Sequence, residues 1–385
     1  MPAAITIVAP PHDASICKRQ GFSDVTIAGD ADIVRGITSH GFAESSLLRR
    51  APADRRWRPL TSAVDLNART AEPLGFHDYA RSVCDPGVTL MLAEPVRGRW
   101  QIARCPLGRI VVQSGATGGA TIADGVSQSG SFAFLLRNCE YAPMSLNGEA
   151  VAINDIAVFP PGKQFAVTCR GPHKWISLSV PLEVLEEVGF STTQLHTLGA
   201  AVSRIRVPHW AAAQLVAAAT QAMDFVQSTP ISADASRFRD IERTLLADLF
   251  AAVIRNNDPV ATSSFQTRSL DSFAHRALAF IRAHGGEDWH VEHLCQATDM
   301  AERSLLRAFH KLFGVGTTQY FKLRRLNQVH CALMESEGRN TTVAGILAIY
   351  GVREFGRFAG AYKTLFGESP SETLKRAGAS GRSSN

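Results

Sequence analysis

VEHLCQATDMAERSLLRAFHKLFG, residues 291–314, and VAGILAIYGVREFGRFAGAYKTLFG, residues 343–367, are two versions of one pattern. Each reads as a short helix, a tight turn and a second helix that ends in Leu-Phe-Gly. Their apolar positions correspond at an offset of 52 residues before the turn and 53 after it. Two helices joined in this way are typical of a helix-turn-helix, which places its second helix in the DNA major groove. We therefore predict two such units, with a helix over 317–335 connecting them.

One face of each second helix is predicted to lie in the core of its unit. Apolar residues three and four positions apart fall on the same side of a helix, and this periodicity runs through both second helices, predicted over 302–313 and 353–366. The predicted core positions are Leu305, Phe309, Leu312 and Phe313 in the first unit, and Phe358, Tyr362, Leu365 and Phe366 in the second.

The opposite faces are predicted to contact DNA. An arginine near the start of a reading helix can bond guanine O6 and N7 together, so we expect Arg303 and Arg307 to read bases. In the second unit we expect Arg357 to hold phosphate, while Phe355 either faces outward or packs locally on the core. The predicted DNA-binding residues are Arg303, Ser304, Leu306, Arg307, Lys311, Arg353, Phe355, Arg357 and Lys363.

Composition bounds the class of protein. The 385 residues are 45% apolar and 19% charged, which is typical of a globular protein with two or more domains. We expect no membrane span, because no run of about 18 apolar residues occurs, and no secretion signal, which together predict a cytoplasmic protein. The seven cysteines are scattered, which favours reduced thiols over disulfides or zinc. Residues 271–385 carry a net charge of +4 out of a total of +5.

Patterning along the chain predicts an α+β protein. Short apolar or alternating runs between turn signals predict an antiparallel barrel or double sheet, and the pattern becomes helical further along. The predicted parts are a mobile N-terminus over 1–21, a β-rich sensing domain over 22–181, a helical segment over 182–257 that mediates dimerisation, a linker over 258–270, a DNA-binding domain over 271–376 that opens with a helix at 271–284, and a mobile tail over 377–385.

These features together resemble the AraC/XylS family of bacterial transcription regulators. YGVREFGRFAGAYKTLFGESPSETLK (350–375) resembles the ethanolamine- and ornithine-regulator type, and NGEAVAINDIAVFPPGKQF (147–165) with KWISLSVP (174–181) resembles the family's cupin-like sensing domain. The resemblance implies a cupin-like antiparallel β-barrel with helices, followed by an all-α double helix-turn-helix domain. It also implies a sequence-specific, effector-responsive activator of nearby metabolic genes, whose partners are operator or promoter DNA, RNA polymerase and a small-molecule effector.

Two positions depart from the family's pattern. Asp299 stands in the first turn where glycine is usual, and Asp tolerates the left-handed conformation that such a turn requires. Gly360 stands where the family often has an arginine, and Gly356 and Gly360 each lower helix propensity by about 1 kcal/mol relative to alanine. We therefore expect the second unit to read bases less sharply than the first.

A homodimer is expected through the helices of 209–257, because two half-sites would double the length of DNA that is read. The alternative is that their apolar stripe packs on the protein's own β-rich domain. The stripe consists of Phe238, Ile241, Leu245, Leu249, Ala252 and Val253.

No catalytic, metal or cofactor site is predicted. His290 and His293 lack a third ligand, and the glycines of 115–120 lack the frame of a phosphate loop. We therefore expect that the protein is not an enzyme. Two alternatives stay open: a bifunctional regulator whose N-terminal domain carries a reactive cysteine, with Cys105 or Cys169 beside an arginine, and a structural DNA binder without sequence choice.

Overall fold

A computed structural model describes residues 74–83, 87–138, 142–228, 235–255, 276–277, 279–280, 291–336 and 341–380. The predicted mobile N-terminus, the linker and most of the helix predicted at 271–284 lie outside the described residues. Residues 276, 277, 279 and 280 are helical.

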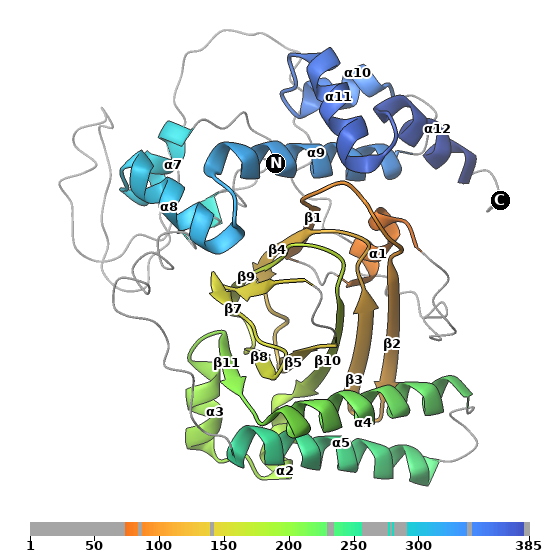
Figure 1. Cartoon of the computed structure of the whole chain (residues 1–385), viewed down its shortest axis with the longest axis vertical. Coiled ribbons are helices and arrows are strands. Elements are labelled where there is room, and N and C mark those ends of the chain that lie inside the picture. The colour runs from red at the N-terminus through yellow and green to blue at the C-terminus, as the bar shows by residue number, and fades with distance from the viewer. Residues whose placement is uncertain are drawn as a thin grey trace, which may run out of the picture. The chain divides into compact units, whose positions relative to one another are not determined.

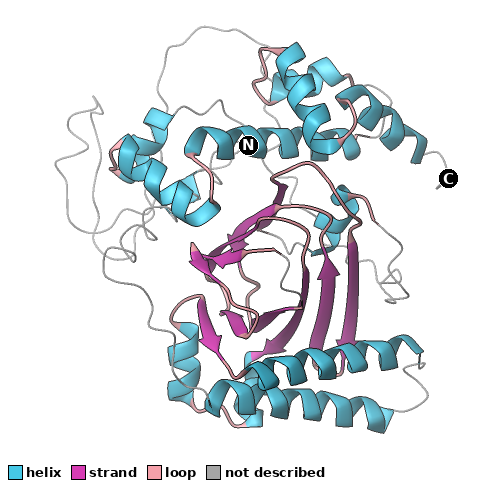
Figure 2. Cartoon of the chain, in the orientation of Figure 1, coloured by secondary structure: helices cyan, strands magenta, loops and turns pink. Residues whose placement is uncertain are grey.

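Two antiparallel sheets form the β-rich part of the chain (Figures 1 and 2). The expected antiparallel β fold is confirmed, as two sheets in place of one closed barrel. The five-stranded sheet has the order β1 (Val88–Leu92), β4 (Thr121–Val126), β9 (Gln164–Cys169), β6 (Met144–Leu146) and β7 (Glu149–Ala150). The six-stranded sheet has the order β11 (Ser203–Arg206), β8 (Asp155–Phe159), β5 (Ser131–Arg137), β10 (Lys174–Pro181), β3 (Ile110–Ala116) and β2 (Gln101–Leu107).

Alternation along the strands gives the six-stranded sheet two different faces. Phe132 and Phe134 of β5 and Ile176 and Leu178 of β10 are buried in a core that helices complete on one side. Full burial of each such side chain contributes about 1.5–3 kcal/mol. The helices of this core are α2 (Leu182–Val188), α3 (Thr192–Gly199), α4 (His209–Ser228) and α5 (Ala235–Arg255), and Figure 1 shows α4 and α5 running side by side along the sheet.

Two expectations for residues 182–257 need correction. The segment is not wholly helical, because β11 pairs with β8 and buries Ile205 between two less buried arginines. The apolar stripe of α5 is not left open for a partner, because Leu245 is 1% exposed and Leu249 is 0% exposed within the core of the chain itself. The alternative packing on the protein's own β domain is therefore observed, and dimerisation stays a prediction.

The C-terminal part is helical. The helices are α7 (Val291–Thr298), α8 (Glu302–Phe313), α9 (Thr317–Met334), α10 (Val343–Ile349) and α11 (Phe355–Phe366). Of these, α8, α9 and α11 lie within two residues of their predicted bounds. A further helix, α12 (Pro370–Ser380), runs into the predicted tail at 377–385. It begins at a reciprocal cap, since the Ser369 N–H donates to Glu372 Oε2 at 2.7 Å and the Glu372 N–H donates to Ser369 Oγ at 3.3 Å. The S-x-x-E pattern of residues 369–372, which is typical of a helix N-terminus, is present in the sequence.

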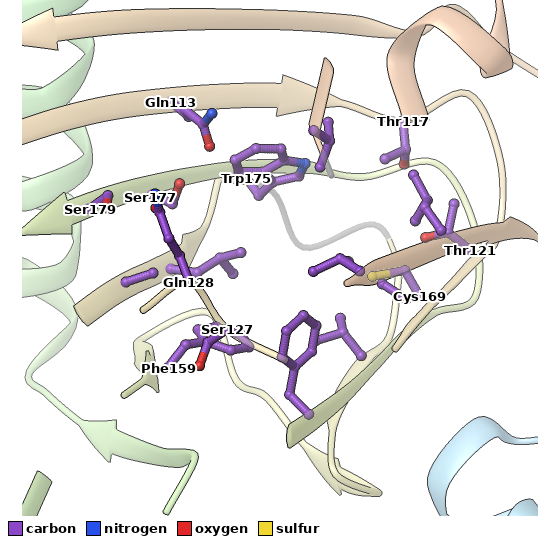
Figure 3. A pocket seen from close by; sticks show the side chains of 18 of the residues that line it. Gln113, Thr117, Thr121, Ser127, Gln128, Phe159, Cys169, Trp175, Ser177 and Ser179 are labelled. Carbon is purple, nitrogen blue, oxygen red and sulfur yellow. The ribbon is translucent and has the colours of Figure 1, made fainter. Parts of the chain in front are cut away.

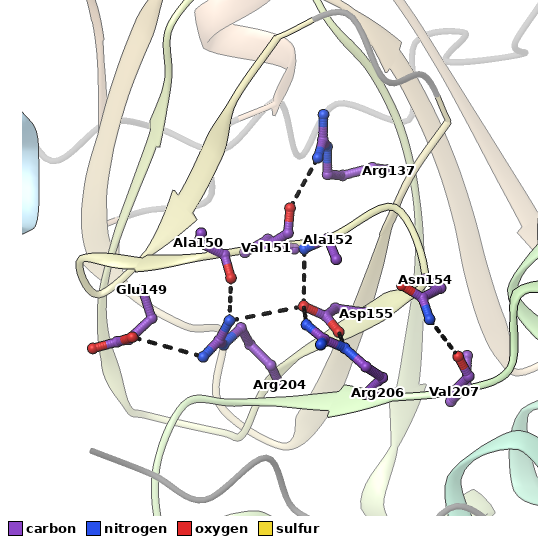
Figure 4. Close-up of polar contacts among 10 residues, drawn as sticks. All are labelled: Arg137, Glu149, Ala150, Val151, Ala152, Asn154, Asp155, Arg204, Arg206 and Val207. Carbon is purple, nitrogen blue, oxygen red and sulfur yellow. Dashed lines mark hydrogen bonds and ion pairs between the residues drawn. The ribbon is translucent and has the colours of Figure 1, made fainter. Parts of the chain in front are cut away.

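Asp155 organises the polar contacts at the β8–β11 edge (Figure 4). Its fully buried carboxylate accepts two hydrogen bonds from Arg206, at 2.8 and 3.2 Å, and one from the Ala152 N–H at 2.8 Å. Arg204 Nη1 lies 3.8 Å from the same carboxylate and donates to the Ala150 carbonyl. The buried charge is thus paired and hydrogen-bonded, as its removal from water requires.

Replacing Asp155 with alanine should lower the free energy of unfolding by about 2–4 kcal/mol, because the Ala152 N–H loses its acceptor and the mostly buried Arg204 loses its counter-charge. Urea unfolding measures the loss. The matched control is Asp240→Ala, which breaks an exposed pair with Arg243 (2.8 Å) and should cost less than about 1 kcal/mol. Equal losses in the two variants would contradict the role given to Asp155.

Candidate nucleic-acid interface and interior cavity

The first helix-turn-helix unit closes around the predicted core. Leu305, Phe309, Leu312 and Phe313 of α8 are each no more than 2% exposed. The turn between α7 and α8 places Asp299 at φ 54°, in the left-handed region, which confirms the conformation expected there. The equivalent turn of the second unit places Gly351 at φ 66°, where glycine carries no steric cost.

The outward face of α8 carries the residues predicted to read bases. Arg303 and Arg307 are exposed, Leu306 is 39% exposed, and Ser304 is half-buried. The two arginines lie four residues apart in the N-terminal half of α8, so they share one face of the helix. This geometry permits both guanidinium groups to reach the same stretch of groove, and their DNA contacts stay a prediction.

Lys311 lies in a different environment from the other predicted contacts on α8. Its Nζ is 3.7 Å from Glu149 Oε1 on β7, and its backbone and side chain pack against Gly148 in the β6–β7 turn. In this arrangement Lys311 is half-buried and ion-paired, so it is less open to a phosphate than the sequence suggested.

The predicted contact residues of the second unit are all exposed. Arg353 lies before the first residue of α11, and Arg357 Nη1 donates to Glu354 Oε2 at 3.0 Å, with Arg357 85% exposed. Phe355 is 44% exposed, which favours the outward reading over local packing on the core. Lys363 is exposed, and Gly356 and Gly360 have open space beside them.

The connector α9 has an unusually polar buried face. Asn327 Oδ1 accepts from the Leu92 N–H at 2.9 Å and its Nδ2 donates to the Leu92 carbonyl at 3.1 Å, so one amide pairs with both backbone groups at the end of β1. The Tyr320 hydroxyl donates to Asp124 Oδ1 on β4 at 2.9 Å. β1 is an edge strand, and Asn327 satisfies backbone groups that an edge would leave unpaired.

A cavity of about 200 Å³ lies between the inner faces of the two sheets. Figure 3 shows Gln113, Trp175 and Ser177 projecting into it from β3 and β10, with Ser127 and Phe159 on another wall. No sequence motif predicted this cavity, because its lining comes from alternate residues of many strands. The periodicity of the strands was the available signal, but it does not say which face is hollow.

The cysteines proposed for covalent chemistry are buried. Cys105 is 0% exposed and burial raises the pKa of its thiol to about 11, the opposite of an activated nucleophile. Cys169 is 2% exposed and lines the cavity. Within the described part of the chain no group of three His, Cys, Asp or Glu side chains is arranged to hold a metal ion. Among the described helices, none has an apolar stretch long enough to cross a bilayer.

Comparisons with known proteins match parts of the chain. Residues 294–376 match the family described as a helix-turn-helix domain. The XylDLEGF operon transcriptional activator of Pseudomonas putida is 31% identical over 101 residues, which are 26% of this chain and 32% of that protein. The XylDLEGF operon transcriptional activator 2 from the same organism is 31% identical over 99 residues, 26% of this chain and 63% of that protein. The chain therefore spans about a third of the first relative and less than two thirds of the second.

A solved structure, of the AraC-like transcriptional activator CuxR, is 18% identical and covers 63% of this chain and 86% of that chain, with a TM-score of 0.34. The helices and the family match together define a double helix-turn-helix DNA-binding domain. Its relatives are operon activators, and the resemblance to the AraC/XylS family is confirmed for this part of the chain.

Unfolding should depend on pH through His330. This side chain stacks on Phe366 with ring centroids 4.1 Å apart, lies against His77, and has its Nδ1 2.7 Å from the Tyr362 hydroxyl. Burial lowers the pKa of His330 to about 3 and also lowers that of His77. The unfolded chain, with histidine pKa values of about 6.5, therefore takes up protons that the folded chain excludes.

The resulting stability is fully present above about pH 6.5 and is lost as pH falls from there toward 3, by at most about 1.4 kcal/mol per pH unit for each histidine. Urea unfolding between pH 5 and 8 measures the slope. His330→Gln should reduce it, whereas His196→Gln, on the exposed surface of α3, should not. An unchanged slope in His330→Gln would contradict the assignment.

Proposed function

We propose that the protein is an effector-responsive transcription activator that binds operator or promoter DNA through α8 and α11. The observation that carries this proposal is the pair of helix-turn-helix units with exposed second-helix faces, joined by one continuous helix, α9. Its action in the cytoplasm on nearby metabolic genes, with RNA polymerase and as a homodimer, is what the AraC/XylS resemblance implies. We assign it no catalytic role, and the raised thiol pKa of Cys105 argues against a reactive cysteine there.

The two units are proposed to divide the work of recognition. Arg303 and Arg307 are exposed on one face of α8, and a guanidinium can pair bidentately with a guanine edge. On α11 the corresponding surface has Gly356 and Gly360, which offer no side-chain donors, and Arg357, which is held beside Glu354. The first unit is therefore suited to choosing bases and the second to holding the phosphate backbone.

Arg307→Ala should cost about 1–3 kcal/mol of specific binding and relax the preference at one operator position. Arg357→Ala should weaken binding to all sequences alike and lower the salt slope by about one unit. Fluorescence anisotropy on a bound promoter fragment and on scrambled DNA, over a range of salt concentrations, measures both. The two variants serve as matched controls for each other, since each removes one exposed arginine from a second helix.

Equal losses for Arg307→Ala on promoter and scrambled DNA would make Arg307 a phosphate contact. Failure of the unmodified protein to prefer any promoter fragment over scrambled DNA would refute sequence-specific regulation, leaving a DNA binder without sequence choice.

The cavity is proposed as the effector site because two strands that line it, β1 and β4, also contact the connector helix α9. On β1, Leu90 lines the cavity while Leu92 pairs with Asn327 of α9. On β4, Ala123 lines the cavity while Asp124, on the opposite face, accepts from Tyr320 of α9. An occupant that moves these two strands therefore acts directly on the helix that joins the DNA-binding units.

We propose that the protein binds DNA more weakly while Asn327 and Tyr320 hold α9 against β1 and β4. With α9 held by Asn327 and Tyr320, Lys311 of α8 is paired with Glu149 and withheld from phosphate. A ligand that binds more tightly when α9 is released from β1 and β4 shifts the population toward the released form. The size of the shift is set by the difference in the ligand's affinity for the bound and released forms.

Asn327→Ala should therefore strengthen operator binding by the protein without effector, by at least about fivefold, the lower end of typical coupling between sites. Anisotropy measures operator affinity, and hydrogen exchange at the Leu92 amide reports loss of the contact between α9 and β1. The control is Gln328→Ala, which removes the neighbouring amide of α9 and should change neither quantity. Faster exchange at Leu92 with unaltered operator affinity would show that the contact between Asn327 and Leu92 is structural and not regulatory.

A further inference from the structure

The cavity between the sheets has an uneven distribution of charge. Among the described residues that line it, Arg104 carries the one permanent charge, and none is an Asp or Glu. The lining His173 is neutral at pH 7, because burial lowers its pKa, and its Nδ1 is hydrogen-bonded to the Thr117 hydroxyl at 2.7 Å. The described walls thus present a single cation to any occupant.

Arg104 belongs to a polar row that crosses three strands. Arg104 of β2 is the register partner of Gln113 on β3, and Gln113 is the register partner of Ser177 on β10. Directly opposed residues of antiparallel strands project from the same face with Cβ atoms about 4.5–5.5 Å apart. A guanidinium, an amide and a hydroxyl therefore follow one another along the same wall, and all three line the cavity.

The polar row is free to bind a ligand. Within the described part of the chain, the side chains of Arg104, Gln113 and Ser177 have no hydrogen bond or ion pair to another residue. This contrasts with Asp155 and Arg206 at the sheet edge, which neutralise each other. A half-buried guanidinium without a protein counter-charge is stabilised by an anion that reaches it.

Apolar surface makes up much of the remaining wall. Trp175 packs against Gly115, where an added Cβ would lie 2.5 Å from the nearest ring atoms, and its Nε1 donates to the Tyr79 hydroxyl at 3.0 Å. The ring is therefore fixed as a rigid side of the cavity. Phe159 and Leu135 are further apolar lining residues. The volume of about 200 Å³ suits a small molecule, below the roughly 300–1,000 Å³ of drug-sized sites.

We propose that this cavity binds a small monocarboxylate with an apolar body, whose carboxylate is held by Arg104 and hydrogen-bonded by Gln113 and Ser177. The inference rests on the proposed effector role of the cavity and names the ligand class. The planar guanidinium matches a carboxylate through two parallel hydrogen bonds, and the apolar body lies against Trp175. An amine is disfavoured, because it would approach Arg104 with no acidic partner among the described lining residues.

The test compares ligands that differ only in charge, measured by calorimetry on the full chain. The probes are octanoate and 3-phenylpropionate, their primary amides, and the matching amines, so that an aliphatic and an aromatic body are separated. At least one acid should bind, at least tenfold more tightly than its amide and its amine. Arg104→Gln should remove the preference of acid over amide, and Arg104→Lys should keep part of it.

Two control variants make the outcome specific. Arg239→Gln removes an exposed arginine of α5 and should leave acid binding unchanged. Ser177→Trp fills the cavity and should abolish binding of every probe, which ties binding to this site. Circular dichroism confirms that each variant is folded, and Arg104→Met replaces Arg104→Gln as the decisive variant if the latter does not fold.

Tighter binding of an amine or amide, or an acid preference that is unchanged in Arg104→Gln, would overturn the carboxylate assignment. Such binding, if lost in Ser177→Trp, would still support the cavity as an effector site. Absence of binding for all three charge classes would overturn both the carboxylate assignment and the proposed effector role.

Discussion

The alternation of side chains along β3, β5 and β10 is the constraint on which the rest of the β domain depends. Every second residue of these strands enters the core beneath α4 and α5, and the residues between them line the cavity. A shift of one residue in register would exchange the two sets and place Gln113 and Ser177 in the apolar core. The same pairing that buries Phe134 and Leu178 therefore also creates a hollow, partly polar interior.

Two strands of the other sheet contact both the cavity and α9. On β4, alternation directs Ala123 to the cavity and Asp124 to α9, whereas the edge strand β1 lines the cavity with Leu90 and pairs the Leu92 backbone with Asn327. Two strands therefore separate the interior from the connector helix. The polar pairs at this contact, Asn327 with Leu92 and Tyr320 with Asp124, have defined geometry and are buried. Buried polar pairs are costly to leave unmade, which makes this contact more specific in its geometry than apolar packing alone.

The DNA-binding part was largely predictable because its signals are local. Helix periodicity, the Leu-Phe-Gly endings and the left-handed turn at Asp299 depend on residues a few positions apart, and each was observed as expected. The apolar stripe of α5 and the basic residue Lys311 show where such reasoning fails. A helix face that is apolar or charged does not reveal which surface will cover it, and here both are covered by the chain's own β domain.

The sequence by itself determined the two helix-turn-helix units, the core of the first unit, and most of the residues that face outward on α8 and α11. Only the tertiary structure decided that Arg104, Gln113 and Ser177 lie in one row, and that α9 forms hydrogen bonds to β1 and β4. The physical reason is the range of the interactions. Helical faces follow from neighbours within about one turn, whereas strand register and the choice of which face encloses a cavity depend on pairings between residues far apart in the chain.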